Sequence, residues 1–125
     1  MLTNHQLTNI FFGLIIYSSL SFLFIYNRST MSILSVNFKV YGIVQGVFFR
    51  KYTLNQAKML ELKGWVRNEY DGTVVGIMQG QPNKIEMMKK WLSTEGSPHS
   101  RIDYCEFTQE KWLTEPEFQT FEITR

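Results

Sequence analysis

The chain has 125 residues, of which 44% are hydrophobic and 19% charged, as expected for one globular domain with a single core. The net charge is only +2, with lysine and glutamate interspersed, so charge alone does not indicate a nucleic-acid or membrane surface. The single cysteine, Cys105, excludes an intramolecular disulfide and suits a reducing compartment.

The first thirty residues differ in composition from the rest of the chain. Residues 10–26 carry no charged side chain, and their length is at the lower limit for a membrane-spanning helix. Three interpretations stay open: a membrane anchor, a secretory signal, or an extension that adds nothing to a domain of residues 31–125. The secretory signal is the least favoured interpretation, because residues 1–9 contain no Lys or Arg and no small-residue cleavage site follows the apolar run. We therefore expect a cytoplasmic protein or, alternatively, a membrane-anchored one whose domain faces the cytoplasm.

From Met31 onward, the hydrophobic pattern alternates between strand and helix. Apolar residues alternate with polar ones from Val36 to Val40, which predicts a strand. A helix is predicted over residues 48–62, with a buried stripe of Phe49, Thr53, Ala57 and Leu60.

Four further strands and a second helix are predicted after the first helix. Two strands are predicted around Asp71-Gly72, a dipeptide suited to a tight turn, and Pro82 fits the first turn of a second helix. The predicted strands are 65–69, 73–79, 102–107 and 118–123. The order β-α-β-β-α-β, with room for an extra strand, predicts an α+β, ferredoxin-like fold, an antiparallel sheet with two helices on one face.

The connection from the first strand to the first predicted helix contains Gly42 and Gly46 and is followed by Arg50. Glycines allow a tight turn that exposes successive N–H groups, and a helix start adds free N–H donors and the positive end of a dipole. This combination suits an anion. An ordinary turn followed by a solvated surface arginine explains the spacing equally well, because the segment is neither a P-loop nor G-x-G-x-x-G.

Other catalytic arrangements are not indicated by the pattern. His5 lies outside the predicted domain, and His99 falls in a loop of Ser, Pro and Gly, so neither has the spacing of a metal ligand. Cys105 fits a packing position in a strand. The sequence therefore predicts no metal site.

Several segments closely resemble the acylphosphatase family across nearly all of residues 31–125. They are GIVQGVFFR (42–50), LKGWVRNEYDGTV (62–74), WLSTEGSPHSRID (91–103) and the aromatic C-terminal strand. The resemblance implies the ferredoxin-like fold and a cofactor-independent hydrolase. Such an enzyme cleaves the carboxyl-phosphate bond of small acyl phosphates, giving a carboxylate and inorganic phosphate. We further expect a monomer that does not bind nucleic acid.

The resemblance also implies roles for particular residues. Arg50 matches the phosphate-binding arginine of the family and Asn68 the asparagine that orients the attacking water. The loop of Gln45, Gly46, Val47, Phe48 and Phe49 matches its backbone phosphate cradle. Two positions depart from the family pattern: Glu61 replaces a common glycine, and Arg125 stands where many members have an aromatic residue.

Two other functions are compatible with the predicted fold. An RNA-binding domain would need aromatic residues on the sheet, and the predicted strand 73–79 has none. A catalytically silent module that binds an anion or a partner is the main alternative, although Arg50 and Asn68 together favour the enzyme.

Overall fold

The first strand is longer than its alternating pattern predicts. In the computed structural model, which describes residues 31–125, Val36 and Val40 lie inside an 11-residue strand, β1. The strand continues through Gly42, where its register with a neighbouring strand shifts. The elements in chain order are β1 (Ile33–Ile43), α2 (Phe49–Met59), β2 (Lys63–Asn68), β3 (Val74–Gly80), α3 (Pro82–Thr94), β4 (Arg101–Leu113) and β5 (Phe121–Ile123).

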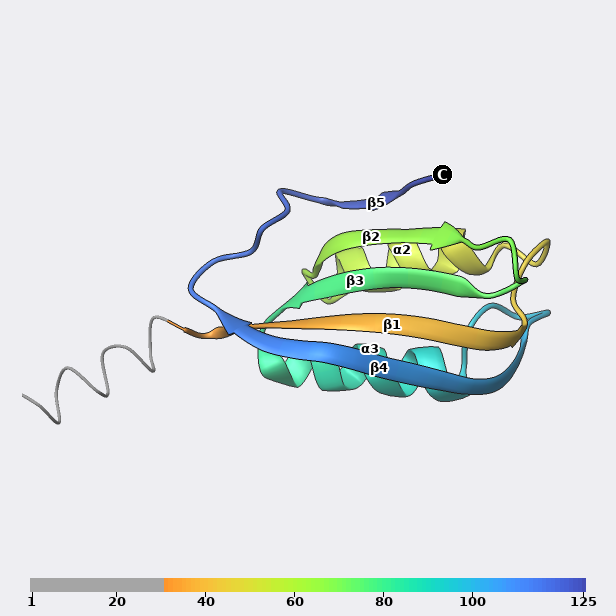
Figure 1. Cartoon of the computed structure of the whole chain (residues 1–125), viewed down its shortest axis with the longest axis horizontal. Coiled ribbons are helices and arrows are strands. Elements are labelled where there is room, and N and C mark those ends of the chain that lie inside the picture. The colour runs from red at the N-terminus through yellow and green to blue at the C-terminus, as the bar shows by residue number, and fades with distance from the viewer. Residues whose placement is uncertain (1–30) are drawn as a thin grey trace, which may run out of the picture. The chain divides into compact units, whose positions relative to one another are not determined.

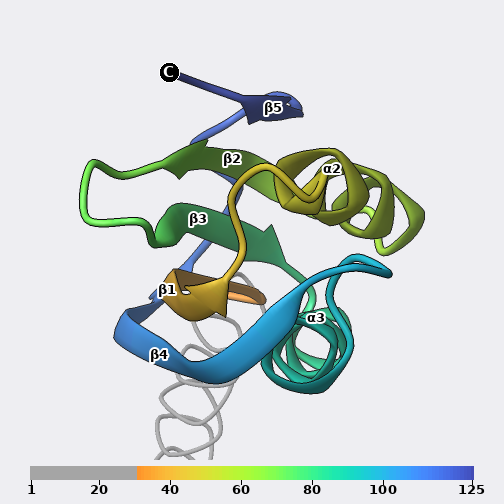
Figure 2. The same ribbon diagram turned by 90° about the vertical axis from the view of Figure 1, so that its right-hand side faces the viewer.

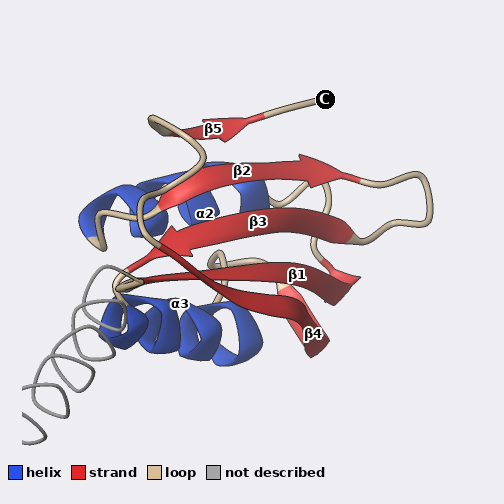
Figure 3. Ribbon diagram, turned by 60° about the vertical axis from the view of Figure 1, so that its left-hand side comes forward, coloured by secondary structure: helices blue, strands red, loops and turns tan. Residues whose placement is uncertain are grey.

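The strands form one sheet in the order β4-β1-β3-β2-β5 (Figure 1). The first four are antiparallel to their neighbours, whereas β5 runs parallel to β2 at one edge. Figure 2 shows both helices on the same face of the sheet, and Figure 3 shows the same two layers from another side. The ferredoxin-like α+β prediction is therefore confirmed, with a parallel edge strand added to the antiparallel sheet.

The core lies between the sheet and the two helices. The predicted helical stripe is buried, with Phe49, Thr53 and Ala57 at most 1% exposed. Burial of such apolar side chains is the main stabilising contribution, at about 25 cal/mol per Å². They pack with side chains from three strands and from α3: Val36, Val40, Val66, Val74, Met78, Ile85, Met88 and Leu92.

Helix α2 ends at Met59, earlier than predicted, because the chain turns into the left-handed region at Glu61 (φ 57°). The N–H of Leu62 donates to the carbonyl of Ala57 at 2.8 Å and that of Glu61 to Lys58 at 3.0 Å. These two bonds are those of a Schellman motif, which satisfies carbonyls at the helix end.

The C-terminal strand also differs from its prediction. Strand β4 extends to Leu113, and the chain then crosses to the opposite edge of the sheet before β5 begins at Phe121 (Figure 1). Gln79 ties this crossing segment to the sheet: its amide donates to Ser35 Oγ at 3.0 Å and to Glu117 Oε1 at 2.9 Å. The crossing thus places β5 beside β2, next to α2.

The predicted hydrophobic segment 10–26 lies outside the described residues. Residues 32–125 pack as one compact unit. Neither helix within residues 31–125 has both the length and the apolar character needed to cross a membrane.

Candidate active site

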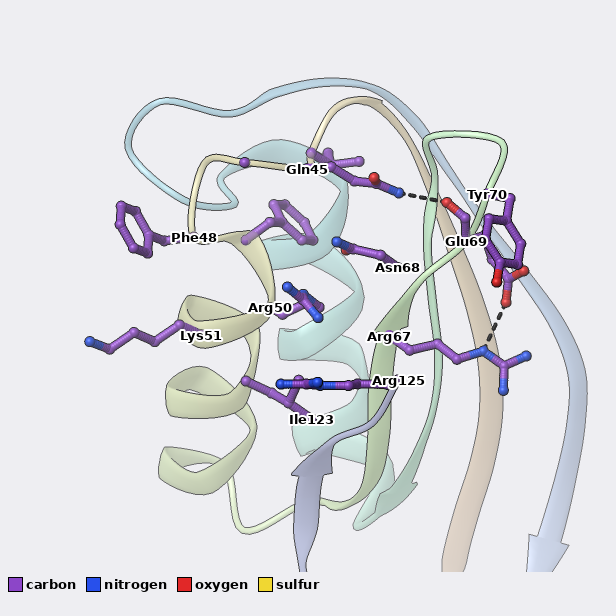
Figure 4. A pocket seen from close by; sticks show the side chains of 13 residues that line it. Gln45, Phe48, Arg50, Lys51, Arg67, Asn68, Glu69, Tyr70, Ile123 and Arg125 are labelled. Carbon is purple, nitrogen blue, oxygen red and sulfur yellow. Dashed lines mark hydrogen bonds and ion pairs between the residues drawn. The ribbon is translucent and has the colours of Figure 1, made fainter.

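A pocket of about 1070 Å³ opens where β1 leads into α2 and where β2 ends. Four parts of the chain form its walls: the β1–α2 loop, the first turn of α2, the end of β2 with the two residues that follow it, and the end of β5 with Arg125 beyond it. Figure 4 shows the side chains that converge there. The lining residues are Val44, Gln45, Gly46, Phe48, Phe49, Arg50, Lys51, Arg67, Asn68, Glu69, Tyr70, Ile123 and Arg125.

The β1–α2 loop turns twice into the left-handed region. Gly46 has φ 75° and Phe48 φ 59°, and Phe48, as the N-cap residue, makes no side-chain capping bond. Within residues 31–125, the N–H groups of residues 45–48 donate to no backbone carbonyl. Left-handed turns direct neighbouring N–H groups to one side and so form a concave site for an anion. The positive end of the α2 dipole adds to the attraction.

Gln45 fixes this loop to the turn between β2 and β3. Its Nε2 donates to the carbonyl of Glu69 at 2.8 Å (Figure 4) and to that of Thr73 at 2.9 Å. Its side-chain amide therefore positions the loop, a role that the sequence did not indicate; its backbone N–H remains part of the predicted cradle.

Asp71 orders the β2–β3 turn, to which Gln45 is hydrogen-bonded. Its carboxylate accepts hydrogen bonds from the backbone N–H and the hydroxyl of Thr73. These bonds, with a further contribution from the ammonium of Lys39, lower the pKa of Asp71 to about 2. Asp71 is thus ionised at neutral pH and holds the turn on which the loop rests.

Arg50 is the second residue of α2 and is half-buried. The preceding residue, Phe49, is 1% exposed and packs against Trp91, with ring centroids 5.8 Å apart, which anchors the helix start. The guanidinium of Arg50 lies between α2 and the end of β2 (Figure 4). Within residues 31–125 it forms no ion pair with a carboxylate. Its charge is therefore available to an anion.

Asn68 is the last residue of β2, and its side chain lies between those of Gln45 and Arg50 (Figure 4). Its Oδ1 is buried and has no hydrogen-bond partner within the described residues. A buried oxygen without a partner is uncommon and calls for a donor from a ligand or a water molecule. The structure thus brings Arg50, Asn68 and four of the five predicted loop residues, Gln45, Gly46, Phe48 and Phe49, to one pocket. Val47 does not line the pocket and instead packs against the core.

Other lining residues were not predicted from the sequence. Arg67 Nε lies 2.8 Å from Glu69 Oε1, so the only carboxylate side chain among the lining residues is already paired. Ile123 and Arg125 reach the pocket because β5 pairs in parallel with β2. The feature that places both residues at the pocket is the register between β5 and β2, and no local sequence pattern indicates that register.

Of the residues considered for other chemistry, His5 lies outside the described residues, and the other two do not line the pocket. His99 is exposed in the loop after α3, and Cys105 packs against the core. Burial raises the pKa of the Cys105 thiol to about 12, so it is not a thiolate at neutral pH. Within residues 31–125, no three His, Cys, Asp or Glu side chains gather as a metal site would require.

The fold and the pocket together define a ferredoxin-like α+β domain with a site able to hold an anion at the start of α2. The acylphosphatase family model matches residues 36–123. Mouse (Mus musculus) acylphosphatase-2 is 49% identical over 89 residues, covering 71% of this chain and 84% of the relative. Human (Homo sapiens) acylphosphatase-2 is 45% identical over 95 residues, covering 76% and 96%.

A solved structure agrees with these sequence matches. The acylphosphatase from Bacillus subtilis is 30% identical, with a TM-score of 0.68 over 74% of this chain and 99% of that one. The chain therefore belongs to the acylphosphatase family and is a hydrolase of that class. The resemblance seen in its motifs is confirmed.

Proposed function

We propose that the pocket hydrolyses the carboxyl-phosphate bond of small acyl phosphates, with the 45–49 loop and Arg50 binding the phosphoryl group and Asn68 orienting the water. The observation that carries this proposal is that the buried Oδ1 of Asn68 has no hydrogen-bond partner, and the guanidinium of Arg50 in the same pocket no carboxylate partner, among residues 31–125.

Arg50 supplies both charge and geometry. A guanidinium offers a planar fork of N–H donors that fits two phosphoryl oxygens at once, beside the N–H groups of the loop. The fixed positive charge and the helix dipole stabilise the negative charge that spreads over the phosphoryl oxygens in the transition state.

Asn68 acts on the nucleophile. Its side-chain oxygen accepts a hydrogen bond from a water molecule and holds it facing the phosphorus atom, which lowers the entropic cost of attack. An amide is a poor base, so a phosphoryl oxygen takes the proton from the attacking water.

The reaction balances without a protein acid. Water attacks phosphorus, the bond from phosphorus to the acyl oxygen breaks, and its electron pair leaves with the carboxylate. The dianionic acyl phosphate and water thus give a carboxylate and dihydrogen phosphate. The leaving group has a conjugate acid of pKa about 4, so it departs as an anion without protonation. This suits a pocket in which no histidine is among the described lining residues.

The test is hydrolysis of acetyl phosphate by the purified chain in ¹⁸O-labelled water. We expect turnover with the label in phosphate, and no turnover of ethyl phosphate, whose alkoxide leaving group needs an acid. A label in acetate would place the attack on carbon and contradict the roles of Arg50 and Asn68. No turnover of acetyl phosphate would favour the silent anion-binding module.

We further propose that residues 31–125 are the functional domain, a monomer, and that residues 1–30 add nothing to its activity. The compact unit 32–125 and the family match to residues 36–123 support this division. Equal kcat/KM for the 31–125 segment and the full chain is the expected result; an inactive, unfolded segment beside an active full chain would refute it.

We also propose that the domain works in the cytoplasm, either free or anchored through residues 10–26. Fractionation with carbonate extraction separates the two cases, because a spanning helix stays in the membrane. Protection of the domain from external protease in intact cells is expected in both; digestion would contradict the cytoplasmic location.

A further inference from the structure

Arg125 lies beside the proposed catalytic residues although it is far from them in the sequence. The parallel register pairs Gly64 with Phe121 and Val66 with Ile123. The N–H of Thr124 continues the ladder by donating to the carbonyl of Val66 at 2.9 Å. Two residues further along both strands, the same register places Arg125 next to Asn68.

The alternation of the strands sets the direction of the side chain. Side chains two residues apart in a strand share a face, so Asn68 lies on the same face as Val66, which is completely buried beneath the helices. On β5, Phe121 is 3% exposed on that face, and Ile123 and Arg125 follow it. Figure 4 shows Arg125 on the pocket wall below Arg50, with Ile123 beside it.

The cations of the pocket differ in their partners. The charge of Arg67 is balanced by Glu69. Lys51 extends away from Arg50 and Asn68 in Figure 4. Within residues 31–125, the Arg125 side chain forms no ion pair with a carboxylate side chain. The proposed function assigns the phosphoryl group to the loop and Arg50, so Arg125 supplies a further positive side-chain charge in the same pocket.

We propose that Arg125 is a specificity-determining residue, which selects acyl phosphates whose acyl group carries a second anion, a carboxylate or a phosphate. The inference rests on the proposed acyl phosphate hydrolysis. Ile123, which is 40% exposed next to Arg125, offers apolar contact to the carbon part of the acyl group. A guanidinium binds either anion through charge-assisted hydrogen bonds, so the two share one recognition chemistry.

The experiment compares rigid substrates of matched shape on the full chain. These are 3- and 4-carboxybenzoyl phosphate and their neutral carbamoyl counterparts, with benzoyl phosphate as the reference. We expect kcat/KM for one carboxy isomer to exceed that of its carbamoyl counterpart about 5- to 10-fold at low salt, as for a partly exposed charge-assisted bond. The preference should shrink as salt is added, because salt screens exposed charges.

Variants at Arg125 separate its role from general electrostatics. Arg125→Gln should abolish the preference while benzoyl phosphate is still hydrolysed, and Arg125→Lys should keep part of it. Lys58→Gln, which removes an exposed charge from the last turn of α2, is the matched control and should retain the preference. The kcat/KM values of 3- and 4-phosphonobenzoyl phosphate, compared with those of the carboxy substrates, then show whether Arg125 prefers a phosphate-like anion or a carboxylate.

Three results would overturn the inference. The first is equal kcat/KM for carboxy and carbamoyl substrates in the unmodified chain. The second is a preference that survives Arg125→Gln. The third is an Arg125→Gln variant that loses all substrates equally and loses inhibition by inorganic phosphate, which would make Arg125 a contact of the reacting phosphoryl group. Failure to hydrolyse benzoyl phosphate at all would instead refute the proposed function.

Discussion

Helices α2 and α3 begin in similar ways, yet α2 begins at the pocket and α3 does not. Neither N-cap residue forms a side-chain capping bond, and neither first turn contains an acidic residue. Each start leaves free N–H groups and the positive end of a dipole. These features alone therefore do not make an anion site.

The two helices differ in the backbone that leads into them. Gln81, the N-cap of α3, is extended (φ −63°, ψ 140°), and Pro82 occupies its first turn without an N–H donor. Phe48, the N-cap of α2, is left-handed and follows the left-handed Gly46. A concave run of N–H groups, together with Arg50 and Asn68, therefore distinguishes the candidate site from an ordinary helix start.

The largest effect is expected at Arg50. Arg50→Ala should raise KM and lower kcat, reducing kcat/KM by about 10³, because the guanidinium is proposed to contact the phosphoryl group in both ground and transition states. Arg50→Lys should recover little, since an ammonium cannot form the bidentate fork. Steady-state kinetics with acetyl phosphate and inhibition by inorganic phosphate are the measurements.

The matched control for Arg50 is Lys84→Ala, which removes a cation from the first turn of α3. Its kinetics and phosphate inhibition should stay unchanged. If both variants lose the same activity, the general charge of helix starts would explain the effect. Normal phosphate inhibition of Arg50→Ala would mean that Arg50 is not the anion contact.

The next largest effect is expected at Asn68. Asn68→Ala should lower kcat by about 10², as for one preorganised hydrogen-bonding group, while inhibition by inorganic phosphate stays nearly normal. This difference between kcat and phosphate inhibition follows from the proposed role of Asn68, which is to hold the water and not the charge of the substrate. Circular dichroism and thermal unfolding must first show that the variant is folded.

Asn83→Ala, in the first turn of α3, is the control for Asn68. It should behave as the unmodified chain. The opposite division, with weak phosphate inhibition in Asn68→Ala and normal inhibition in Arg50→Ala, would make Asn68 the anion contact and the β1–α2 loop an ordinary turn.

Much of the fold could be predicted from the sequence because its signals are local. The strand alternation around Phe38 and the helical stripe from Phe49 to Ala57 depend on periodicity, and the structure confirms them. The predicted end of α2 and the predicted start of β5 were wrong by three residues each, and β4 continues to Leu113, beyond its predicted end at residue 107. The end of α2 depends on the left-handed Glu61, a conformation that most residues disfavour.

The candidate site was predicted only in part, because some of its residues are placed by contacts between distant segments and not by local patterns. Arg50 and Asn68 were identified by the family motifs and not by their spacing. The side-chain hydrogen bonds of Gln45 and the position of Arg125 at the pocket depend on contacts between segments that are 24 or more residues apart. Such contacts follow from tertiary packing, which no local pattern records.

A smaller effect is expected at Gln45. Gln45→Ala removes two hydrogen bonds to the β2–β3 turn and should loosen the loop. We expect kcat/KM to fall about tenfold, which corresponds to about 1.4 kcal/mol and lies within the range for the loss of two hydrogen bonds. Gln81→Ala, at the same kind of position before α3, should change nothing, since its side chain forms no capping bond. Equal activity of Gln45→Ala and the unmodified chain would show that the loop keeps its shape without this tie.

The smallest effect concerns the other ends of the two helices. After α2 the left-handed position is occupied by Glu61 (φ 57°), and after α3 by Gly96 (φ 63°). A left-handed residue with a Cβ costs about 1–2 kcal/mol, and glycine avoids this cost but gains freedom in the unfolded chain. Glu61→Gly should therefore raise the free energy of unfolding by about 0.5–1 kcal/mol, measured by urea denaturation, with kcat/KM unchanged.

The reverse change at α3 is the matched test. A Cβ on Gly96 would lie 2.6 Å from Ser100 Oγ and 2.8 Å from Phe49 Cε2, so Gly96→Ala adds crowding to backbone strain. It should lower the free energy of unfolding by about 1 kcal/mol or more. Because Phe49 anchors the start of α2, this variant should also reduce activity, whereas Glu61→Gly should not. A loss of stability in Glu61→Gly would show that the glutamate side chain contributes more than its backbone strain costs.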